Sequence, residues 1–380
     1  GWWSTDDPVA VVQVIIRNLD RLDRYRNGWE RATGPLSDRI RRALPRHTRD
    51  RNKDDIGAHY DIGNDFFALF LDDTMTYSSA IFPTPDATLL EASRHKYDVL
   101  LRKLGVTEHH HLLEIGTGWG GMAIRAATTI ECRVTTTTIS DEQLREATRR
   151  VADAGVRDRV TLLGDDWRDL TAGELAGTYD RLVSIEMIEA VDWRDYDEFF
   201  STIERCLAPD GLAAIQAICL PDSRWERAKN TEDFIRRFVF PNGFLPSIGA
   251  IERAVHHSTR MRVVDVHDIT PHYAETLRRW RERFDAQLDE VLALGLDARF
   301  TRLWRFYLAY CEAGFRERHC TVAQLVLAGE QADLAGVADM GATAQFHRIS
   351  APCRIGTAHG EHPNMLAIFL AEQRHRARRN

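Results

Sequence analysis

An apolar run that leads directly into a glycine-rich turn is the feature of this sequence that most constrains its fold. Residues 112–115 (LLEI) are followed by glycines at 116, 118 and 121, and a segment of good helix formers, residues 122–127, comes next. The glycines satisfy the G-x-G-x-x-G spacing, which lets the backbone bend sharply and lets a ligand approach the main chain at the positive end of a helix. The pattern therefore predicts a strand, a nucleotide-binding turn and a helix, in that order.

Two positions distinguish between the ligands that such a turn can hold. A dinucleotide-binding enzyme places an acidic residue about 20 positions further on, at the tip of the second strand, where it binds a ribose. Here residues 133–139 carry no carboxylate at that tip, whereas Glu114 stands two residues before Gly116. The opening Glu-x-Gly-x-Gly resembles that of S-adenosylmethionine (SAM) methyltransferases. We therefore favour a methyl donor over a dinucleotide, with a plain chain turn as the structural alternative.

Helix and strand patterns alternate around this turn and predict a doubly wound α/β domain. The expected order is helix 86–104, strand 111–115, helix 119–129, strand 133–139, helix 141–154, strand 159–163, strand 181–185, helix 194–207 and strand 211–219. Such an alternation favours a mainly parallel sheet, with ligands bound beyond the carboxyl ends of its strands. Two aromatic-rich helical stretches, at about 222–256 and 268–318, interrupt the alternation.

Seven further motifs, in unbroken order over roughly residues 55–328, are far more specific than the glycine turn. They are HYDIGNDFF at 59–67, MTYSSA at 75–80, SIEMIEAV at 184–191, DFI at 233–235, FPNGFLPS at 240–247, PHYA at 271–274 and YCEAGFR at 310–316. Together they resemble the cyclopropane-fatty-acyl-phospholipid synthases and their mycolic-acid and methyl-branching relatives. The resemblance implies a class I SAM-dependent methyltransferase fold, Rossmann-like and doubly wound, with a mostly parallel seven-stranded sheet, a helical N-terminal segment and helical lid insertions.

The resemblance also implies a division of the chain into three parts. Residues 1–54 are expected to be a basic, mainly helical segment, the end of a truncated lipid-binding domain. Residues 55–328 are expected to form the methyltransferase domain, and its insertions at about 222–256 and 268–318 to cover the active site and wall a lipid tunnel. Residues 329–380 form a C-terminal extension to which we assign no role.

The N-terminal segment concentrates positive charge. Between Arg17 and Lys53 lie twelve Arg or Lys against five acids, although the whole chain has a formal net charge of −7. Apolar residues recur there at helical spacing: Val11, Val14, Ile15, Leu19 and Leu22. Two interpretations stay open, a solvated helix packed on the catalytic domain or a peripheral contact with an anionic membrane surface, where each basic residue contributes on the order of 1 kcal/mol. Nucleic acid fits less well, because no recognition-helix or aromatic-interleaved pattern accompanies the charge.

Other features bear on the compartment. No stretch approaches the ~18 apolar residues of a membrane-spanning helix, and the first seven residues lack the features of a signal peptide. Six scattered cysteines without a CxxC pair are expected to be reduced thiols. The run of histidines at 109–111 does not predict a metal site, because consecutive residues of an extended segment point to alternate sides. We expect a cytoplasmic protein, peripherally associated with the inner face of the membrane.

The family resemblance assigns residues to the methyl donor. The positions expected to bind SAM are Tyr77, Ser78, Glu114, Gly116, Gly118, Thr138, Gln143 and Trp167. Gln143 also fits the S-x-x-Q capping box of a helix that starts after Ser140. Trp167, expected to stack on adenine, has the alternative of an ordinary core tryptophan.

The chemistry that the resemblance implies is demanding. An isolated C=C bond is a poor nucleophile, so the alkene must be held in line with the sulfonium methyl group and away from water. Methyl transfer leaves a carbocation, which aromatic faces and a nearby negative charge stabilise, and a base must then remove a proton. In this family the base is a bicarbonate ion, and its expected ligands here, matched by position, are Ser79, Glu189, Gln216, the backbone at Ile218, and Tyr273. Glu189 is expected to accept the hydrogen bond of the bicarbonate O–H.

Three positions depart from the best-known members of the family. Ser79 stands where they have Cys, Gln216 where they have His, and Ala190 where a His is common. Ser and Gln keep hydrogen-bonding ability, so we expect a working enzyme, and we keep a lipid-binding relative with an impaired site as the non-enzymatic alternative. An N- or O-methyltransferase of a small acceptor would share only the glycine turn.

The expected product is a cyclopropane fatty acid, formed on an unsaturated phospholipid acyl chain. Hydride shift and proton loss from another carbon would instead give a methylene- or methyl-branched chain. The residues do not indicate which of these products forms from the carbocation. Family behaviour suggests a homodimer.

Overall fold

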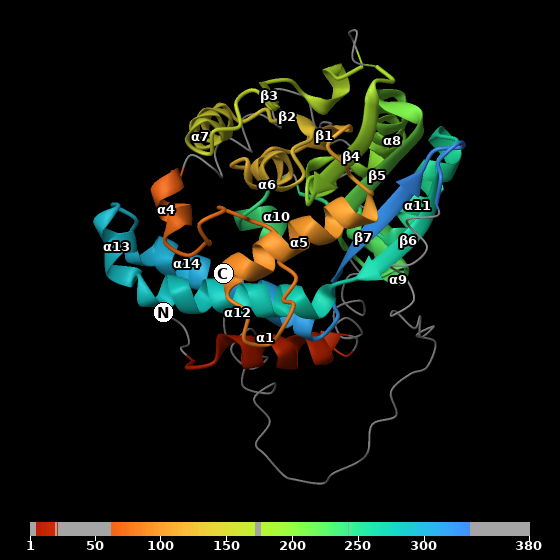
Figure 1. The fold of residues 1–380 in the computed structure, drawn as a ribbon. Helices are drawn as coiled ribbons and strands as arrows, with labels where there is room; N and C mark the ends of the chain where they lie inside the picture. Colours follow the sequence, from red (N-terminus) through yellow and green to blue (C-terminus); the bar gives the residue numbers. More distant parts are fainter. Residues whose placement is uncertain (1–4, 20, 22–61, 172–175, 242, 335–380) are drawn as a thin grey trace. The chain divides into compact units, whose positions relative to one another are not determined.

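The computed structural model describes residues 5–19, 21, 62–171, 176–241 and 243–334 (Figure 1). Most of the basic run between residues 17 and 53, the start of the 59–67 motif and the C-terminal extension beyond residue 334 lie outside these ranges. The predictions made for those stretches therefore stay predictions.

A seven-stranded sheet with the order β3-β2-β1-β4-β5-β7-β6 organises the domain. Its strands are β1 His111–Ile115, β2 Arg133–Thr137, β3 Val160–Leu163, β4 Tyr179–Ile185, β5 Leu207–Cys219, β6 Arg262–Asp268 and β7 Thr321–Ala328. Strands β1 to β5 pair in parallel, and β7 pairs antiparallel with both β5 and β6. The expected seven-stranded, mostly parallel sheet is confirmed. The strand order reverses between β1 and β4, where such sheets bind ligands beyond the carboxyl ends of the strands.

Helices cover both faces of the sheet (Figure 1). One face is covered by α8 (Tyr196–Cys206) and α11 (Ile248–Ser258), and the other by α5 (Leu89–Lys103), α6 (Gly121–Thr129) and α7 (Asp141–Asp153). Adjacent residues of one strand serve opposite faces, as the pleat requires. Leu112 joins the core under α5 and α6, whereas Leu113 joins the core under α8 and α11.

The position of α11 corrects one boundary. The stretch 222–256 was expected to cover the active site, but Ile251 and Val255 of α11 are buried in the sheet core. Trp225 of the short helix α9 (Asp222–Ala228) belongs to the same core, whereas no residue of α10 (Phe234–Phe238) does. The apolar residues of α11 are spaced to pack against the sheet. The aromatic residues of the whole stretch had pointed instead to a cover over the active site.

A further helical layer carries most of the aromatic residues. It is formed by α4 (Asn64–Ala68), α12 (Thr270–Ala286), α13 (Leu288–Ala293) and α14 (Ala298–Arg316). Its core is a cluster of buried rings, including Phe66, Phe67, Phe70, Trp280, Phe284 and Trp304. The rings of Phe66 and Trp304 meet edge to face, with centroids 4.9 Å apart. Edge-to-face pairs add about 0.5–1.5 kcal/mol to the burial of the rings, so this layer is rigid enough to serve as a wall.

The first helix, α1 (Pro8–Arg17), packs against α14 through Val9 and Val12. Arg17 forms an ion pair with Glu317. Two of the apolar residues noted at helical spacing, Val14 and Ile15, are 59% and 47% exposed. Helix α1 therefore packs on α14 through one apolar strip and has a second, outward apolar strip, so both interpretations of this segment stay open.

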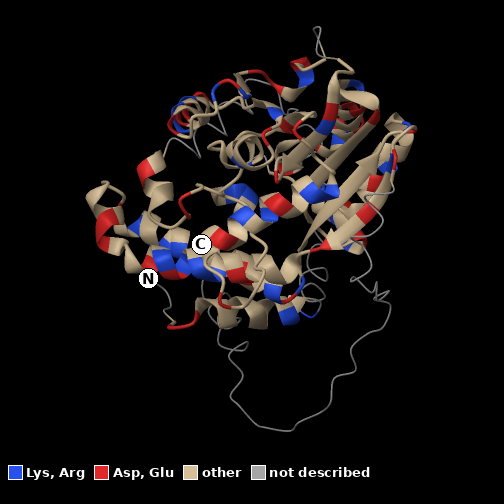
Figure 2. Cartoon of the chain, in the orientation of Figure 1, with Lys and Arg blue, Asp and Glu red and all other residues tan. Residues whose placement is uncertain are grey.

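Charges of both signs are interspersed along the helices in the view of Figure 2, while the central strands are largely uncharged. Within the ranges that the structure describes, no helix is long and apolar enough to span a membrane.

Candidate active site

One cavity of about 440 Å³ lies beyond the carboxyl ends of the central strands. Its lining comes from the segments that follow β1, β2, β3 and β4, from the end of β5, and from α12 and α14. All eight residues expected to bind SAM line this cavity, as do Glu189, Ile218 and Tyr273 of the expected catalytic set. Ser79 and Gln216 are not in the lining and are fully buried behind it.

The glycine turn after β1 has the backbone geometry that the sequence predicted. Gly116 and Gly118 have φ of +101° and +52°, in the left-handed region that favours glycine. A Cβ on Gly116 would lie 3.2 Å from Cγ of Met187, whereas a Cβ on Gly118 would meet nothing within 4 Å. Gly118 therefore leaves open space on the side of the cavity.

Glu114, at the end of β1, is a buried carboxylate. It accepts a hydrogen bond of 2.7 Å from Oγ1 of Thr136. Burial raises the pKa of Glu114 to about 8, against the opposing effects of this hydrogen bond and of the Lys96 ammonium. The position is suited to accept a hydrogen bond from a ligand that approaches the glycine turn.

The tip of β2 and the start of α7 are joined by hydrogen bonds. Thr138 donates from Oγ1 to Oε1 of Gln143 over 2.9 Å, and the Ser140 hydroxyl accepts from the Gln143 backbone N–H over 3.3 Å. Gln143 thus both takes part in the helix cap and lines the cavity. Its contact with SAM stays a prediction.

Trp167 follows β3, and its position is compatible with both roles that the sequence left open. Its ring packs edge to face on Phe199, with centroids 5.2 Å apart, and the Arg168 guanidinium lies 4.3 Å from its ring centroid. The side chain is buried in the sheet core and also lines the cavity. It can therefore offer a fixed ring to an adenine, which remains a prediction.

Lys96 is a buried cation that the sequence analysis missed. Its Nζ donates to Oγ of Ser78 over 2.7 Å, and the side chain is fully buried. Burial lowers the pKa of Lys96 to about 8, although the negative charges of Glu186, Asp72 and Glu114 oppose that shift. A signal was present, because Lys96 falls on the apolar face of α5 with Leu89, Ala92 and Leu100, where an unpaired charge would be costly.

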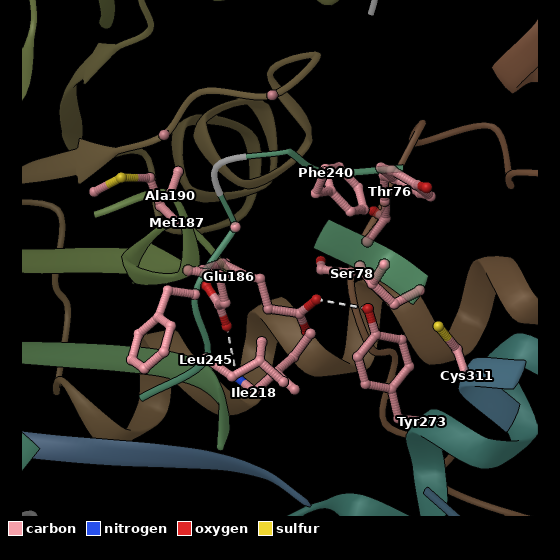
Figure 3. Close-up of a pocket in the computed structure, with 18 of the residues that line it drawn as sticks. Thr76, Ser78, Glu186, Met187, Ala190, Ile218, Phe240, Leu245, Tyr273 and Cys311 are labelled. Carbon is pink, nitrogen blue, oxygen red and sulfur yellow. Dashed lines mark hydrogen bonds between the residues drawn. The ribbon is translucent and has the colours of Figure 1, made fainter. Parts of the chain in front are cut away.

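Glu186, directly after β4, is the second residue that was missed, and its side chain accepts three hydrogen bonds. Its Oε1 accepts from the Ser79 backbone N–H and from Nε2 of Gln216, each over 2.8 Å. Its Oε2 accepts from the Tyr273 hydroxyl over 2.7 Å, as Figure 3 shows. The Ser79 hydroxyl itself donates to the backbone carbonyl of Ala80. The signal was the first of two glutamates in the motif SIEMIEAV, of which only the second, Glu189, was assigned a role.

Glu189 lies three residues further on, in the 3₁₀ helix η2 (Ile188–Ala190). Two similar short helices are η1 (Trp167–Asp169), after β3, and η3 (Trp193–Asp195), after η2. Oε1 of Glu189 accepts from the Ile218 backbone N–H over 2.6 Å. Its Oε2 is buried without a hydrogen-bond partner among the described residues. Burial first, and then the charge of Glu186, raise the pKa of Glu189 to about 8. A protonated Glu189 can donate a hydrogen bond into the cavity.

The opposite wall of the cavity is apolar and aromatic. Leu277 of α12, Tyr307 and Phe315 of α14, and Phe240 and Leu245 of the segment after α10 line it. Phe240, Leu245 and Tyr273 surround the same space as Glu186 in Figure 3. Such a wall can hold a hydrocarbon chain, exclude water and present ring faces to a cation.

A mostly parallel seven-stranded sheet of this order, with a glycine turn and a buried acid at its switch point, defines a class I SAM-dependent methyltransferase. The family model described as mycolic acid cyclopropane synthetase matches residues 47–325. The chain belongs to this family and is a SAM-dependent methyltransferase.

Several relatives show the same relationship. The chain is 43% identical over 337 residues to the tuberculostearic acid methyltransferase UfaA1 of Mycobacterium tuberculosis, an alignment that covers 87% of this chain and 77% of the relative. It is 34% identical over 268 residues to the cyclopropane-fatty-acyl-phospholipid synthase of Escherichia coli, with 70% of this chain and 66% of the relative covered. The crystal structure of mycolic acid cyclopropane synthase CmaA1 complexed with SAH and CTAB superposes with a TM-score of 0.66 at 30% identity, covering 75% of this chain and 99% of that one.

Proposed function

We propose that this protein transfers the methyl carbon of SAM to the double bond of an unsaturated fatty acyl chain of a phospholipid and closes a cyclopropane ring. The observation that carries the proposal is the composition of this cavity. The glycine turn and Glu114 lie at one end, an aromatic and apolar wall from α12 and α14 lies at the other, and buried carboxylates lie between them. A methyltransferase of small polar acceptors has no use for such a wall.

The side chains of the cavity support each requirement of this reaction. When bound, SAM supplies an electrophilic methyl group, which the π electrons of the alkene attack while the carbon–sulfur bond breaks. The α12–α14 wall holds the chain and excludes water from the cation that results. The Tyr273 ring, stacked on Phe315 at 4.4 Å, is fixed in place and offers an aromatic face at the cavity.

A second product is favoured by a specific observation, the 43% identity to a protein named as a tuberculostearic acid methyltransferase. In this alternative, hydride shift precedes proton loss from the added methyl group, and a methylene branch results. Conversion of that branch to a methyl group would need two electrons and two protons, that is, a hydride from a separate reductant and a proton.

The intact phospholipid and the membrane surface are part of the proposal. They are supported by the outward apolar strip of α1, with Val14 and Ile15 exposed, next to a sequence rich in Arg. We propose that α1 and the basic run contact an anionic bilayer from its cytoplasmic side. Sedimentation with phosphatidylglycerol vesicles tests this, because replacement of both exposed residues by Glu should reduce the bound fraction. The homodimer suggested by the family is tested by light scattering.

Mass spectrometry of total fatty acids tests the reaction itself, in cells that express this chain and receive methionine with a deuterated methyl group. A gain of one methylene unit on monounsaturated chains with two deuteriums retained supports a ring or a methylene branch, and proton NMR of the purified ester separates these two. Three retained deuteriums would mean that the proton left from a chain carbon. No gain, with SAM binding intact, would overturn the proposal.

A further inference from the structure

We propose that Glu186 is a built-in carboxylate base that replaces the bicarbonate ion implied by the family resemblance. This inference rests on the proposed function, because it names the group that removes the proton from the cation formed in that reaction. It also changes the expected requirements of the enzyme, which would then need no added anion.

The first argument is the set of donors around Glu186. The resemblance assigned an anion to Ser79, Gln216 and Tyr273, and in the structure these residues donate instead to the two oxygens of one side chain. A carboxylate presents the same two oxygens as a bicarbonate does. Because these donors are engaged, and the Ile218 N–H is taken by Glu189, the residues present do not fit a bound bicarbonate ion.

The second argument is the place of Glu186 in the sheet. Gly116 and Glu186 follow β1 and β4, the neighbouring strands at the switch point, and both line the cavity. The loops are in contact, since a Cβ on Gly116 would lie 3.2 Å from the side chain of Met187, the next residue after Glu186. The carboxylate is therefore held beside the turn expected to bind the methyl donor, with Tyr273 and the apolar wall facing it (Figure 3).

The third argument concerns charge and backbone. Burial raises the pKa of Glu186, while three hydrogen bonds and the Lys96 ammonium act in the opposite direction and favour the charged form. A general base needs a pKa high enough to accept a proton and low enough for the group to be ionised at the working pH. Glu186 also has φ of +51°, a conformation that costs a non-glycine residue on the order of 1 kcal/mol. The side chain is kept at a position where glycine would be unstrained, which points to a role in the site.

The proposed step balances as follows. The alkene π pair forms a bond to the SAM methyl carbon, the carbon–sulfur pair stays on sulfur, and S-adenosylhomocysteine and a secondary carbocation result. Glu186 then takes a proton from the added methyl group, and the electrons of that C–H bond form the new carbon–carbon bond of the ring. The neutral Glu186 carboxyl afterwards releases its proton to solvent, which restores the base.

Two substitutions of Glu186 test the inference, with the full chain and vesicles of unsaturated phospholipid. Turnover is measured in buffer freed of carbon dioxide and again with added bicarbonate. The wild type should be equally active in both. Glu186→Gln keeps the volume and should lose about 10²- to 10⁴-fold in turnover, the usual contribution of a positioned base. Glu186→Gly relieves the backbone strain and vacates the carboxylate position, so its residual turnover should rise when bicarbonate is added.

Two measurements keep the result interpretable. SAM binding by calorimetry should be retained in both variants, which shows that they fold, and the exposed Glu198→Gln on α8 should behave as the wild type. A wild type whose turnover depends on bicarbonate, or a Glu186→Gln variant with near wild-type turnover, would overturn the inference. In either case methyl transfer to acyl chains would stand, whereas a wild type that adds no carbon to them would remove the proposed function itself.

Discussion

The two ends of the cavity are built in different ways. The donor end is built mainly from short segments at the carboxyl ends of β1, β2, β3 and β4, and it contains the buried ionisable groups Glu114, Glu186 and Glu189, with Lys96 of α5 beside them. The acyl end consists of side chains on long helices, α12 and α14, and its rings and aliphatic groups carry no charge. The donor end depends on backbone geometry and electrostatics, and the acyl end on volume and shape.

This difference predicts that the two ends respond to different perturbations. A change of volume in the acyl end should alter chain preference and stability but leave SAM binding intact. A change of backbone or charge in the donor end should alter SAM binding, turnover or the pH dependence of stability, and leave the chain preference intact. The following predictions test that separation, in order of decreasing expected effect.

The largest effect is expected from removing bulk in the acyl end. Leu277→Ala deletes a side chain that is 1% exposed and lines the cavity, and it should destabilise the protein by about 2–5 kcal/mol. Leu308→Ala, in the same aromatic cluster but outside the cavity lining, is the matched control with a similar stability loss. Only Leu277→Ala should shift turnover towards longer or bulkier acyl chains, as product analysis of mixed substrates would show. An equal shift in both variants would contradict the assignment of this wall.

The next effect depends on pH and belongs to the donor end. Glu189 titrates near pH 4.5 when unfolded and at about 8 in the fold, so the folded state holds its proton more tightly between these values. The stability present at low pH is therefore lost as the pH rises towards 8. The unfolding temperature should fall between pH 5 and 8, and the fall should be shallower in Glu189→Gln. Leu277→Ala should keep the wild-type slope, and a slope unaffected by Glu189→Gln would contradict the raised pKa of Glu189.

A third prediction isolates the glycine turn. Gly118 and Gly155 both have positive φ, +52° and +69°, and a Cβ on either would meet nothing within 4 Å. Replacement by Ala should therefore cost the two positions similar stability, about 1–2 kcal/mol. Of the two positions only Gly118 lines the cavity, and Gly118→Ala should weaken SAM binding by about 2 kcal/mol, or roughly 30-fold in Kd. Calorimetry that finds equal SAM affinity in both variants would remove Gly118 from the donor site.

The smallest effect concerns α1, whose Ile16 reaches the cavity lining. Val12 is 3% exposed and Val14 is 59% exposed. Val12→Ala should cost about 1–2 kcal/mol from two lost methyl groups, and Val14→Ala less than about 0.5 kcal/mol. Chemical denaturation measures both, and a similar cost for the two would mean that α1 does not dock on α14 as described.

Much of the donor end could be predicted from sequence because it is local. Residues 111–115, the glycines that follow and the Ser140 cap of α7 each depend on neighbours within a few positions, and the structure has them as expected. The acyl end could be expected only through the family resemblance, because the packing of α12 against α14 is a contact between distant segments that no local sequence pattern predicts. Which apolar strip of α1 is buried could not be predicted either, because only its packing against α14 decides that.

By itself, the sequence determined the order of the first five strands and their helices, the turn for a methyl donor and the family, since these depend on periodicity, backbone freedom and residue spacing. The tertiary structure decided what the polar residues do with one another. Ser79, Gln216 and Tyr273 come from segments far apart in the chain, and they meet only because β4, β5 and α12 converge at one edge of the sheet. There they enclose the carboxylate of Glu186, because a buried charge is stable only where donors surround it.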